Sequence, residues 1–171
     1  MVLDKFRSLN TFILDVDGVL TKGTVLATDD DSMLREFNIK DGFALQFAVK
    51  KGYKVIIISG GNSPGVKKRL LNLGIEEVHT AIPDKVKFLK ELAELKSLDL
   101  RKAVYMGDDF PDISVSELCG INTCPADAIW QIKESSSWIS DKKGGEGAVR
   151  QLIETVLTLR GDWESSSNSV W

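Results

Sequence analysis

The sequence has few of the residues that several large classes of protein require. Its 171 residues include one histidine, His79, and two cysteines, Cys119 and Cys124. Two cysteines cannot build the disulfide framework of a small secreted domain. One histidine excludes a paired-histidine zinc site within a single chain. Because the first residues show no signal-peptide pattern, we expect a reduced, cytoplasmic protein whose cysteines are buried thiols and whose histidine is a packing or surface residue.

An excess of positive charge and long apolar runs are also missing. Lysine and arginine number 22 against 25 for aspartate and glutamate, which gives a net charge of -3. A dedicated nucleic-acid-binding domain would carry a basic excess. No apolar run reaches the roughly 20 residues that a membrane-spanning helix needs. The sequence therefore predicts neither a nucleic-acid partner nor a membrane segment.

The composition that remains is that of one globular domain, with 43% hydrophobic and 27% charged residues. Short apolar runs alternate with amphipathic helical patterns along the chain. The expected strands are 11–16, 54–58, 77–80, 103–106, 121–124 and 138–140. The expected helices are 42–51, 64–73, 84–95, a short one ending at 118, 128–133 and 146–160. This alternation predicts an α/β fold: a doubly wound, Rossmann-like parallel sheet with helices on both faces.

Between the first strand and the first helix there is room for a small β-hairpin flap and for no large cap domain. Residues 24–38 are polar at their centre, where Asp29 to Asp31 form the expected turn, and the flap covers about 22–38. Its apolar side chains exceed what a projecting ribbon can bury, which favours burial between subunits. We assign 1–160 to a single domain and the serine-rich residues 161–171, with Trp163 and Trp171, to a C-terminal tail.

The polar residues with catalytic potential follow predicted strands. They are Asp15, Asp17, Ser59, Lys85, Asp108, Asp109 and Asp112. The carboxyl ends of parallel strands meet at one edge of a sheet. We therefore expect a single acidic pocket that contains one lysine and one hydroxyl.

Several carboxylates in one pocket repel one another unless a cation lies between them. Oxygen ligands of this kind suit Mg²⁺, which often bridges to a phosphate. We expect Asp15, Asp17, through its carbonyl oxygen, and Asp108 to hold the metal, with Asp109 and Asp112 around them. The predicted cofactor is Mg²⁺.

Beside such a cation, Asp15 is positioned to attack phosphorus as a nucleophile and to form an aspartyl phosphate. Asp17 would protonate the leaving oxygen and then deprotonate the attacking water. Ser59, Gly60 and Lys85 would bind the phosphoryl oxygens. The predicted reaction is hydrolysis of a phosphate monoester.

Four motifs resemble those of the haloacid dehalogenase superfamily of phosphohydrolases. They are DVDGVLT (15–21), Ser59-Gly60, Asp84-Lys85 and GDDFPD (107–112). The segments FNIKDG (37–42), LGI (73–75), YMGDD (105–109), PADA (125–128) and GGEGAVR (144–150) are similar to one branch, the 3-deoxy-D-manno-octulosonate 8-phosphate phosphatases. The resemblance implies a cap-less enzyme of lipopolysaccharide biosynthesis that hydrolyses this acidic sugar phosphate. It also implies a homotetramer in which the hairpin packs against neighbouring subunits and the C-terminal segment reaches a neighbour's pocket.

Alternatives to this substrate and to this activity stay open. Gly61 stands where many members of the branch carry an arginine, and a related branch hydrolyses the 9-phosphates of nine-carbon sialic-acid-type sugars. A phospho-receiver module combines similar residues, but its phosphorylated aspartate follows a later strand, where this chain has Ser59. A catalytically idle oligomeric module is the third possibility, although every catalytic position is filled with a suitable residue.

Overall fold

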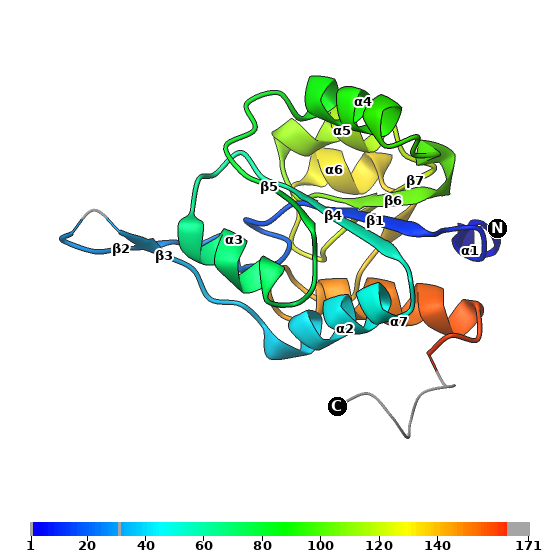
Figure 1. Ribbon diagram of the computed structural model, residues 1–171, viewed down its shortest axis with the longest axis horizontal. Coiled ribbons are helices and arrows are strands. Elements are labelled where there is room, and N and C mark those ends of the chain that lie inside the picture. The colour runs from blue at the N-terminus through cyan, green and yellow to red at the C-terminus, as the bar shows by residue number, and fades with distance from the viewer. Residues whose placement is uncertain (1, 31, 164–171) are drawn as a thin grey trace.

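A computed structural model describes residues 2–30 and 32–163 and contains a six-stranded sheet (Figure 1). The strands are β1 (Thr11–Leu14), β4 (Lys54–Ile58), β5 (Glu77–His79), β6 (Ala103–Met106), β7 (Ile121–Cys124) and β8 (Trp138–Ile139). Their order is β5-β4-β1-β6-β7-β8, and every neighbouring pair is parallel. The predicted parallel α/β sheet is confirmed, with β1 near its centre.

Helices cover both faces of the sheet (Figure 1). One layer contains α2 (Ile39–Lys50), α3 (Pro64–Leu71) and α7 (Ala148–Leu159), and the other contains α4 (Lys85–Leu95), α5 (Ile113–Ser116) and α6 (Trp130–Ser135). Alternate residues of β1 supply the two cores: Phe12 and Leu14 belong to the first cluster, whereas Ile13 belongs to the second. All four residues of β1 are buried, as expected for a strand with helices on both sides.

Side chains that cap helices fix where the helices begin near the functional edge. Asn38 accepts a hydrogen bond from the backbone N–H of Lys40, so α2 begins at Ile39. The apolar pattern predicts a later start, at Gly42. Asp84 accepts one from the N–H of Lys87 and makes Lys85 the first residue of α4. Capping thus sets the position of a residue that the sequence singles out for phosphate binding.

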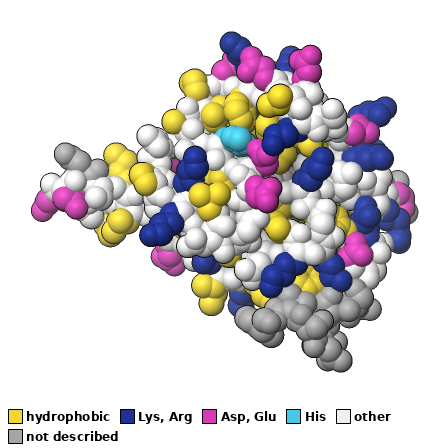
Figure 2. Space-filling model, viewed as in Figure 1, with side chains coloured by type: hydrophobic (Ala, Val, Ile, Leu, Met, Phe, Trp, Pro, Cys, Tyr) yellow, Lys and Arg dark blue, Asp and Glu magenta, His cyan; other side chains and the backbone are white. Residues whose placement is uncertain are grey.

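The predicted flap is a two-stranded antiparallel hairpin, β2 (Leu26–Ala27) and β3 (Met33–Leu34). It projects from the body of the molecule and carries apolar side chains on its surface (Figure 2). Leu26 is 64% exposed and Met33 is 59% exposed. The described residues contain no large cap domain beside this hairpin.

The two ends of the described chain carry features that the sequence did not reveal. A short helix, α1 (Val2–Phe6), precedes β1 and was not predicted. At the other end, Trp163 packs on Phe47, with 4.9 Å between ring centroids, and lies under the Arg150 guanidinium at 4.4 Å. The packed part therefore continues past residue 160, to Trp163. The role predicted for the rest of the tail, 164–171, lies outside the described residues.

Two short 3-10 helices complete the structure, η1 (Leu100–Lys102) and η2 (Phe110–Asp112). Helix η2 directly follows the loop after β6. Within residues 2–30 and 32–163, no helix has the length and apolarity needed to cross a membrane.

Candidate active site

An open cleft of about 740 Å³ lies at the carboxyl edge of the sheet. Its lining includes Asp15, Asp17, Ser59, Gly60, Lys85, Asp108, Asp109 and Asp112. These are the residues that the sequence analysis selected from four separate loops. They meet because β4, β1 and β6 are neighbours in the sheet and run in the same direction.

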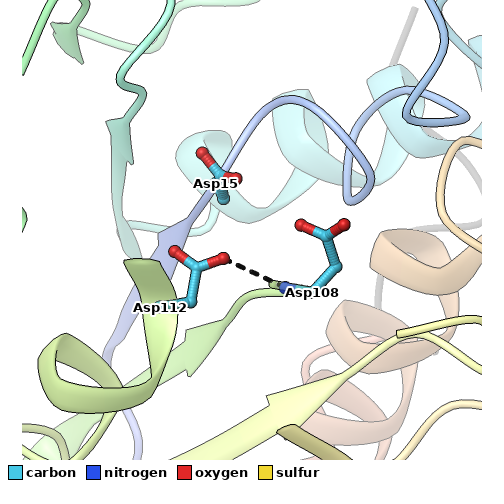
Figure 3. Close-up of side chains that lie close together, drawn as sticks. All are labelled: Asp15, Asp108 and Asp112. Carbon is cyan, nitrogen blue, oxygen red and sulfur yellow. Dashed lines mark hydrogen bonds between the residues drawn. The ribbon is translucent and has the colours of Figure 1, made fainter. Parts of the chain in front are cut away.

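Three carboxylates converge at the floor of the cleft (Figure 3). Asp15, Asp108 and Asp112 each offer one oxygen, and these oxygens lie within 4.8 Å of one another. Burial, followed by repulsion from Asp112, raises the pKa of Asp15 to about 6. Burial, followed by repulsion from Asp15 and Asp112, raises the pKa of Asp108 to about 7. The cluster therefore holds more negative charge than the protein itself compensates.

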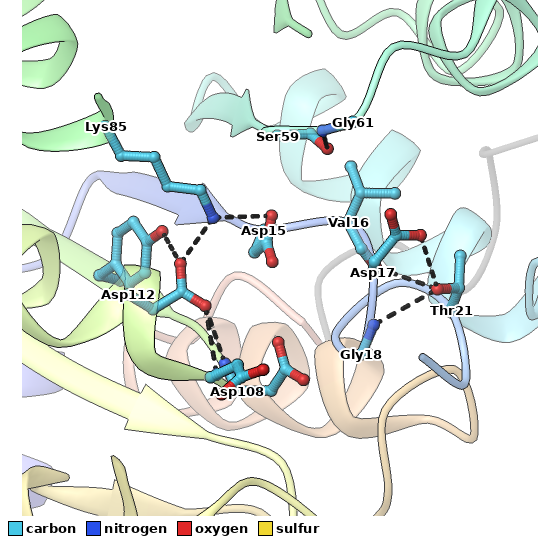
Figure 4. A network of polar contacts seen from close by, with 12 residues as sticks. Asp15, Val16, Asp17, Gly18, Thr21, Ser59, Gly61, Lys85, Asp108 and Asp112 are labelled. Carbon is cyan, nitrogen blue, oxygen red and sulfur yellow. Dashed lines mark hydrogen bonds and ion pairs between the residues drawn. The ribbon is translucent and has the colours of Figure 1, made fainter. Parts of the chain in front are cut away.

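Lys85 supplies the positive charge inside this cluster (Figure 4). Its Nζ lies 3.0 Å from Asp15 Oδ1 and 2.7 Å from Asp112 Oδ1, and its side chain is 7% exposed. Burial alone would lower the pKa of Lys85, but the two carboxylates outweigh burial and raise it. Lys85 is thus a permanent cation directly beside Asp15.

Asp112, the third carboxylate of the cluster, accepts hydrogen bonds from four donors. Its Oδ1 accepts hydrogen bonds from Lys85 Nζ and from the Tyr105 hydroxyl, at 2.7 and 2.6 Å. Its Oδ2 accepts from the backbone N–H groups of Asp108 and Asp109, at 3.0 and 3.5 Å. A carboxylate with this many donors is fixed in place and orients its neighbours.

Asp17 lies apart from the three-carboxylate cluster, near the start of the loop that follows β1. Arg35 of the hairpin donates Nε to Asp17 Oδ1 at 2.7 Å and Nη2 to Asp17 Oδ2 at 3.2 Å. The side chain of Asp17 is 39% exposed toward the cleft. The expectation that residue 17 contributes a metal ligand therefore concerns its carbonyl oxygen, because its carboxylate is engaged elsewhere.

Gly18 makes the tight turn after Asp17 possible. Its φ of +81° lies in the left-handed region, and a Cβ at this position would come within 1.9 Å of Asp108 Oδ2. The Gly18 N–H donates to Thr21 Oγ1 at 3.4 Å, which closes the turn (Figure 4). The glycine thus brings the loop after β1 against the loop after β6.

Ser59 and Gly60 follow β4 and form the opposite wall of the cleft. The Ser59 hydroxyl oxygen accepts a hydrogen bond from the Gly61 N–H at 3.2 Å, and the residue is 4% exposed. Its proton therefore remains available to donate to a ligand.

The other polar residues considered in the sequence analysis lie outside the three-carboxylate cluster. Asp109 is exposed, and its carboxylate accepts from the Phe110 N–H at the start of η2. His79 pairs with Glu77 and packs on Phe88, away from the cleft. Burial raises the pKa of both Cys119 and Cys124, as expected for unreactive thiols.

Two residues of the site were not selected from the sequence. Tyr105 lies in β6, whose other residues are apolar and buried. A phenol in such a strand could have indicated a polar partner nearby, because a buried hydroxyl needs one. Arg35 follows β3, and nothing in the local sequence separates it from an ordinary surface arginine. Only the fold of the hairpin brings it to Asp17.

The donor set fits a hard divalent cation. Carboxylate oxygens converge, no sulfur or imidazole is among the cleft-lining residues, and the raised pKa values of Asp15 and Asp108 indicate uncompensated negative charge. A cation there and Lys85 beside it would together accept an anionic ligand. The arrangement offers a nucleophile, a second carboxylate and phosphate-binding groups in one cleft.

Comparisons with known proteins agree with this chemistry. The chain is 30% identical over 160 residues to 3-deoxy-D-manno-octulosonate 8-phosphate phosphatase KdsC of Salmonella typhi, covering 94% of this chain and 85% of that protein. A scan of protein-family models gives no match.

Solved structures of similar proteins share the fold. The phosphatase of this name from Yersinia pestis superposes with a TM-score of 0.93 at 27% identity, covering 96% of this chain and 89% of that one. The one from Moraxella catarrhalis gives 0.92 at 29% identity, covering 96% and 94%, and its crystals contain a magnesium ion, a phosphate ion and a KDO molecule. KDO is the eight-carbon acidic sugar of that enzyme's name.

Proposed function

The chain belongs to the 3-deoxy-D-manno-octulosonate 8-phosphate phosphatase family, and from this premise we propose that it is a Mg²⁺-dependent phosphatase of that sugar phosphate. The observation that carries the proposal is the position of Asp15, 3.0 Å from Lys85 and within the three-carboxylate cluster. From the same family membership we also propose that it acts in the cytoplasm, in lipopolysaccharide biosynthesis.

The first half of the reaction uses Asp15 and Asp17. A carboxylate oxygen of Asp15 attacks phosphorus, and the bond between phosphorus and the sugar oxygen breaks. Asp17 gives its proton to the departing oxygen, so that the sugar leaves as an alcohol. The product on the protein is an acyl phosphate on Asp15.

The second half regenerates the protein. Asp17, now ionised, takes a proton from a water molecule, whose oxygen attacks the phosphorus of the acyl phosphate. The bond between phosphorus and the Asp15 oxygen breaks, inorganic phosphate forms and Asp15 is again a carboxylate. Asp17 serves both halves because it lies at the open side of the cleft, where leaving group and water enter and depart.

The remaining residues hold the phosphoryl group and the metal. The Lys85 ammonium and the Ser59 hydroxyl offer donors to phosphoryl oxygens from two walls of the cleft, and Gly60 leaves the backbone there accessible. Asp15, Asp108 and the carbonyl oxygen of Asp17 would hold Mg²⁺, while Asp112 orients Lys85 and the Asp108 backbone. When bound, the metal neutralises the phosphate and favours its in-line displacement.

Phosphate release from a panel of sugar phosphates, with Mg²⁺ present, tests the proposed function. The panel contains 3-deoxy-D-manno-octulosonate 8-phosphate, the 9-phosphate of a nine-carbon sialic-acid-type sugar and a neutral sugar phosphate such as mannose 6-phosphate. We expect the largest kcat/KM for the first. A larger value for the 9-phosphate would select the related branch, and no release from any compound would favour an idle module.

The hairpin leads to a prediction about assembly. Val25, Leu26, Met33 and Leu34 are each about half or more exposed on a two-stranded ribbon, and isolated ribbons of this kind are marginally stable in water. We expect a homotetramer in which neighbouring subunits cover these side chains. Light scattering coupled to gel filtration measures the mass.

A matched pair of variants separates this cause from general instability. Leu26→Ser with Leu34→Ser should shift the mass toward smaller species, whereas Ile39→Ser, which changes an even more exposed apolar residue on α2, should not. A wild-type monomer at working concentration would contradict the prediction.

A further inference from the structure

The hairpin brings a guanidinium to the edge of the cleft. Arg35 binds both carboxylate oxygens of Asp17, and its Nη1 also donates to the Met33 carbonyl oxygen at 3.2 Å. The Arg35 side chain is 10% exposed, so it lies against the body of the protein although the hairpin projects. Each Nη atom carries one further N–H. These two N–H groups lie in the plane of the guanidinium and can donate to other acceptors.

The cleft needs positive charge if its ligand is a sugar acid. Its lining holds the carboxylates of Asp15, Asp17, Asp84, Asp108, Asp109 and Asp112 and the ammonium of Lys85. Lys85 already lies between Asp15 and Asp112. A cation in the cluster would serve the phosphate end of the substrate, but the carboxylate at its other end would still meet a negative surface. Arg35 offers a guanidinium here, because it contacts Asp17 of this lining.

The position of Gly61 shows that Arg35 faces the phosphate-binding wall. A Cβ at Gly61 would lie 3.4 Å from Asp17 Oδ2, 3.6 Å from Arg35 Nη2 and 3.6 Å from Ser59 Oγ. These are ordinary contact distances, so the guanidinium lies next to the turn that carries Ser59. The absence of a side chain at 61 leaves the approach to Arg35 open.

We infer that Arg35 recognises the carboxylate of the substrate, exchanging its bonds with Asp17 for the same bonds with the sugar acid. The inference rests on the proposed function. A substrate carboxylate has the geometry of the Asp17 carboxylate, so one planar fork fits either partner. The exchange also releases both oxygens of Asp17 to face the leaving group. Binding of the acidic end thus prepares the residue that transfers the proton.

The test compares two substrates on one set of variants. kcat and KM are measured for 3-deoxy-D-manno-octulosonate 8-phosphate and for mannose 6-phosphate, which lacks the carboxylate. Arg35→Gln should lower the ratio of the two kcat/KM values by about 10- to 100-fold, the range expected for hydrogen bonds to a charged group. Most of the loss should fall on KM for the acidic substrate. Lys22→Gln is the control, because Lys22 lies at the base of the same hairpin and pairs with exposed Glu36; it should leave the ratio unchanged.

Two further variants separate recognition from support of the hairpin. Arg35→Lys keeps the charge but not the fork and should restore only part of the ratio. Gly61→Arg in the Arg35→Gln background returns a guanidinium to the same place from the opposite wall, at a backbone position outside the left-handed region, and should restore much of the ratio.

The outcomes also separate this inference from the proposed function. An equal loss for both substrates, or an unchanged ratio, would show that Arg35 only positions Asp17 and would overturn the inference. A wild-type protein without preference for the acidic substrate would overturn the proposed function itself.

Discussion

Asp15→Asn should reduce phosphate release to less than about a hundredth of the wild-type rate, because an amide does not attack phosphorus. The fold should survive the change. Asparagine has the size of aspartate, and it removes a charge whose burial and repulsion from Asp112 raise the pKa of Asp15 to about 6. We therefore expect a melting temperature at or above that of the wild type. Steady-state phosphate release and thermal unfolding measure the two quantities.

A second variant and a control define this result. Asp17→Asn leaves the nucleophile in place and removes the proton transfer, so the rate should fall by roughly 10² to 10⁴. Asp99→Asn removes a carboxylate before β6, at the opposite edge of the sheet, where Asp99 pairs with Arg101. It should keep the wild-type rate. Turnover of Asp15→Asn above about a hundredth of wild type would contradict the nucleophile assignment.

Removal of the metal should have an effect of similar size. After exhaustive chelation we expect no measurable phosphate release, and Mg²⁺ should restore it, because Asp15, Asp108 and Asp112 leave their negative charge uncompensated without a cation. An anionic phosphate cannot approach such a cluster closely. Activity that survives chelation unchanged would exclude the metal from the reaction.

The metal should also change stability, with a definite dependence on pH. Without a cation, the pKa values of Asp15 and Asp108, about 6 and about 7, lie above the ordinary aspartate value of 3.8. Between these limits the folded protein holds protons that the unfolded chain loses. The stability contributed by these protons is present at low pH and disappears as the pH rises through the folded values.

Mg²⁺ and protons therefore compete for the same oxygens. The rise in melting temperature on adding Mg²⁺ should be larger near pH 8 than near pH 5. Thermal unfolding with and without Mg²⁺ at both pH values measures it, and Asp108→Asn should reduce the rise. An equal rise at both values, or none, would mean that the ion does not bind to these carboxylates.

Much of the site follows from the order of strands along the chain. Asp15, Ser59 and Asp108 each follow an apolar run, and parallel strands place all such residues at one edge. The rule needs no knowledge of side-chain conformations, so it holds even where the strand ends are uncertain. Lys85 follows from the same reasoning together with the capping residue Asp84. Residue pattern and connectivity together predict which loops meet.

Contacts across the cleft are made by long side chains, and the sequence pattern does not predict which partners these side chains contact. Arg35 is 18 residues from Asp17, on a hairpin whose path decides whether it reaches the cleft or the solvent. Asp112 accepts hydrogen bonds from Lys85, Tyr105 and two backbone N–H groups, and nothing in the local sequence indicates that Lys85 and Tyr105 are its partners. Such networks are assembled only after the sheet has formed.

By itself, the sequence determined the parallel α/β fold, the small hairpin without a cap, and the set of loops that build the cleft, because apolar periodicity and strand order are local properties of the chain. Tertiary structure alone decided that Tyr105 and Lys85 hold Asp112, that Trp163 packs on α2, and that Arg35 meets Asp17. The physical reason is that periodicity reports which residues are buried, whereas the partners of a buried or flexible side chain are set by the packing of elements far apart in the sequence.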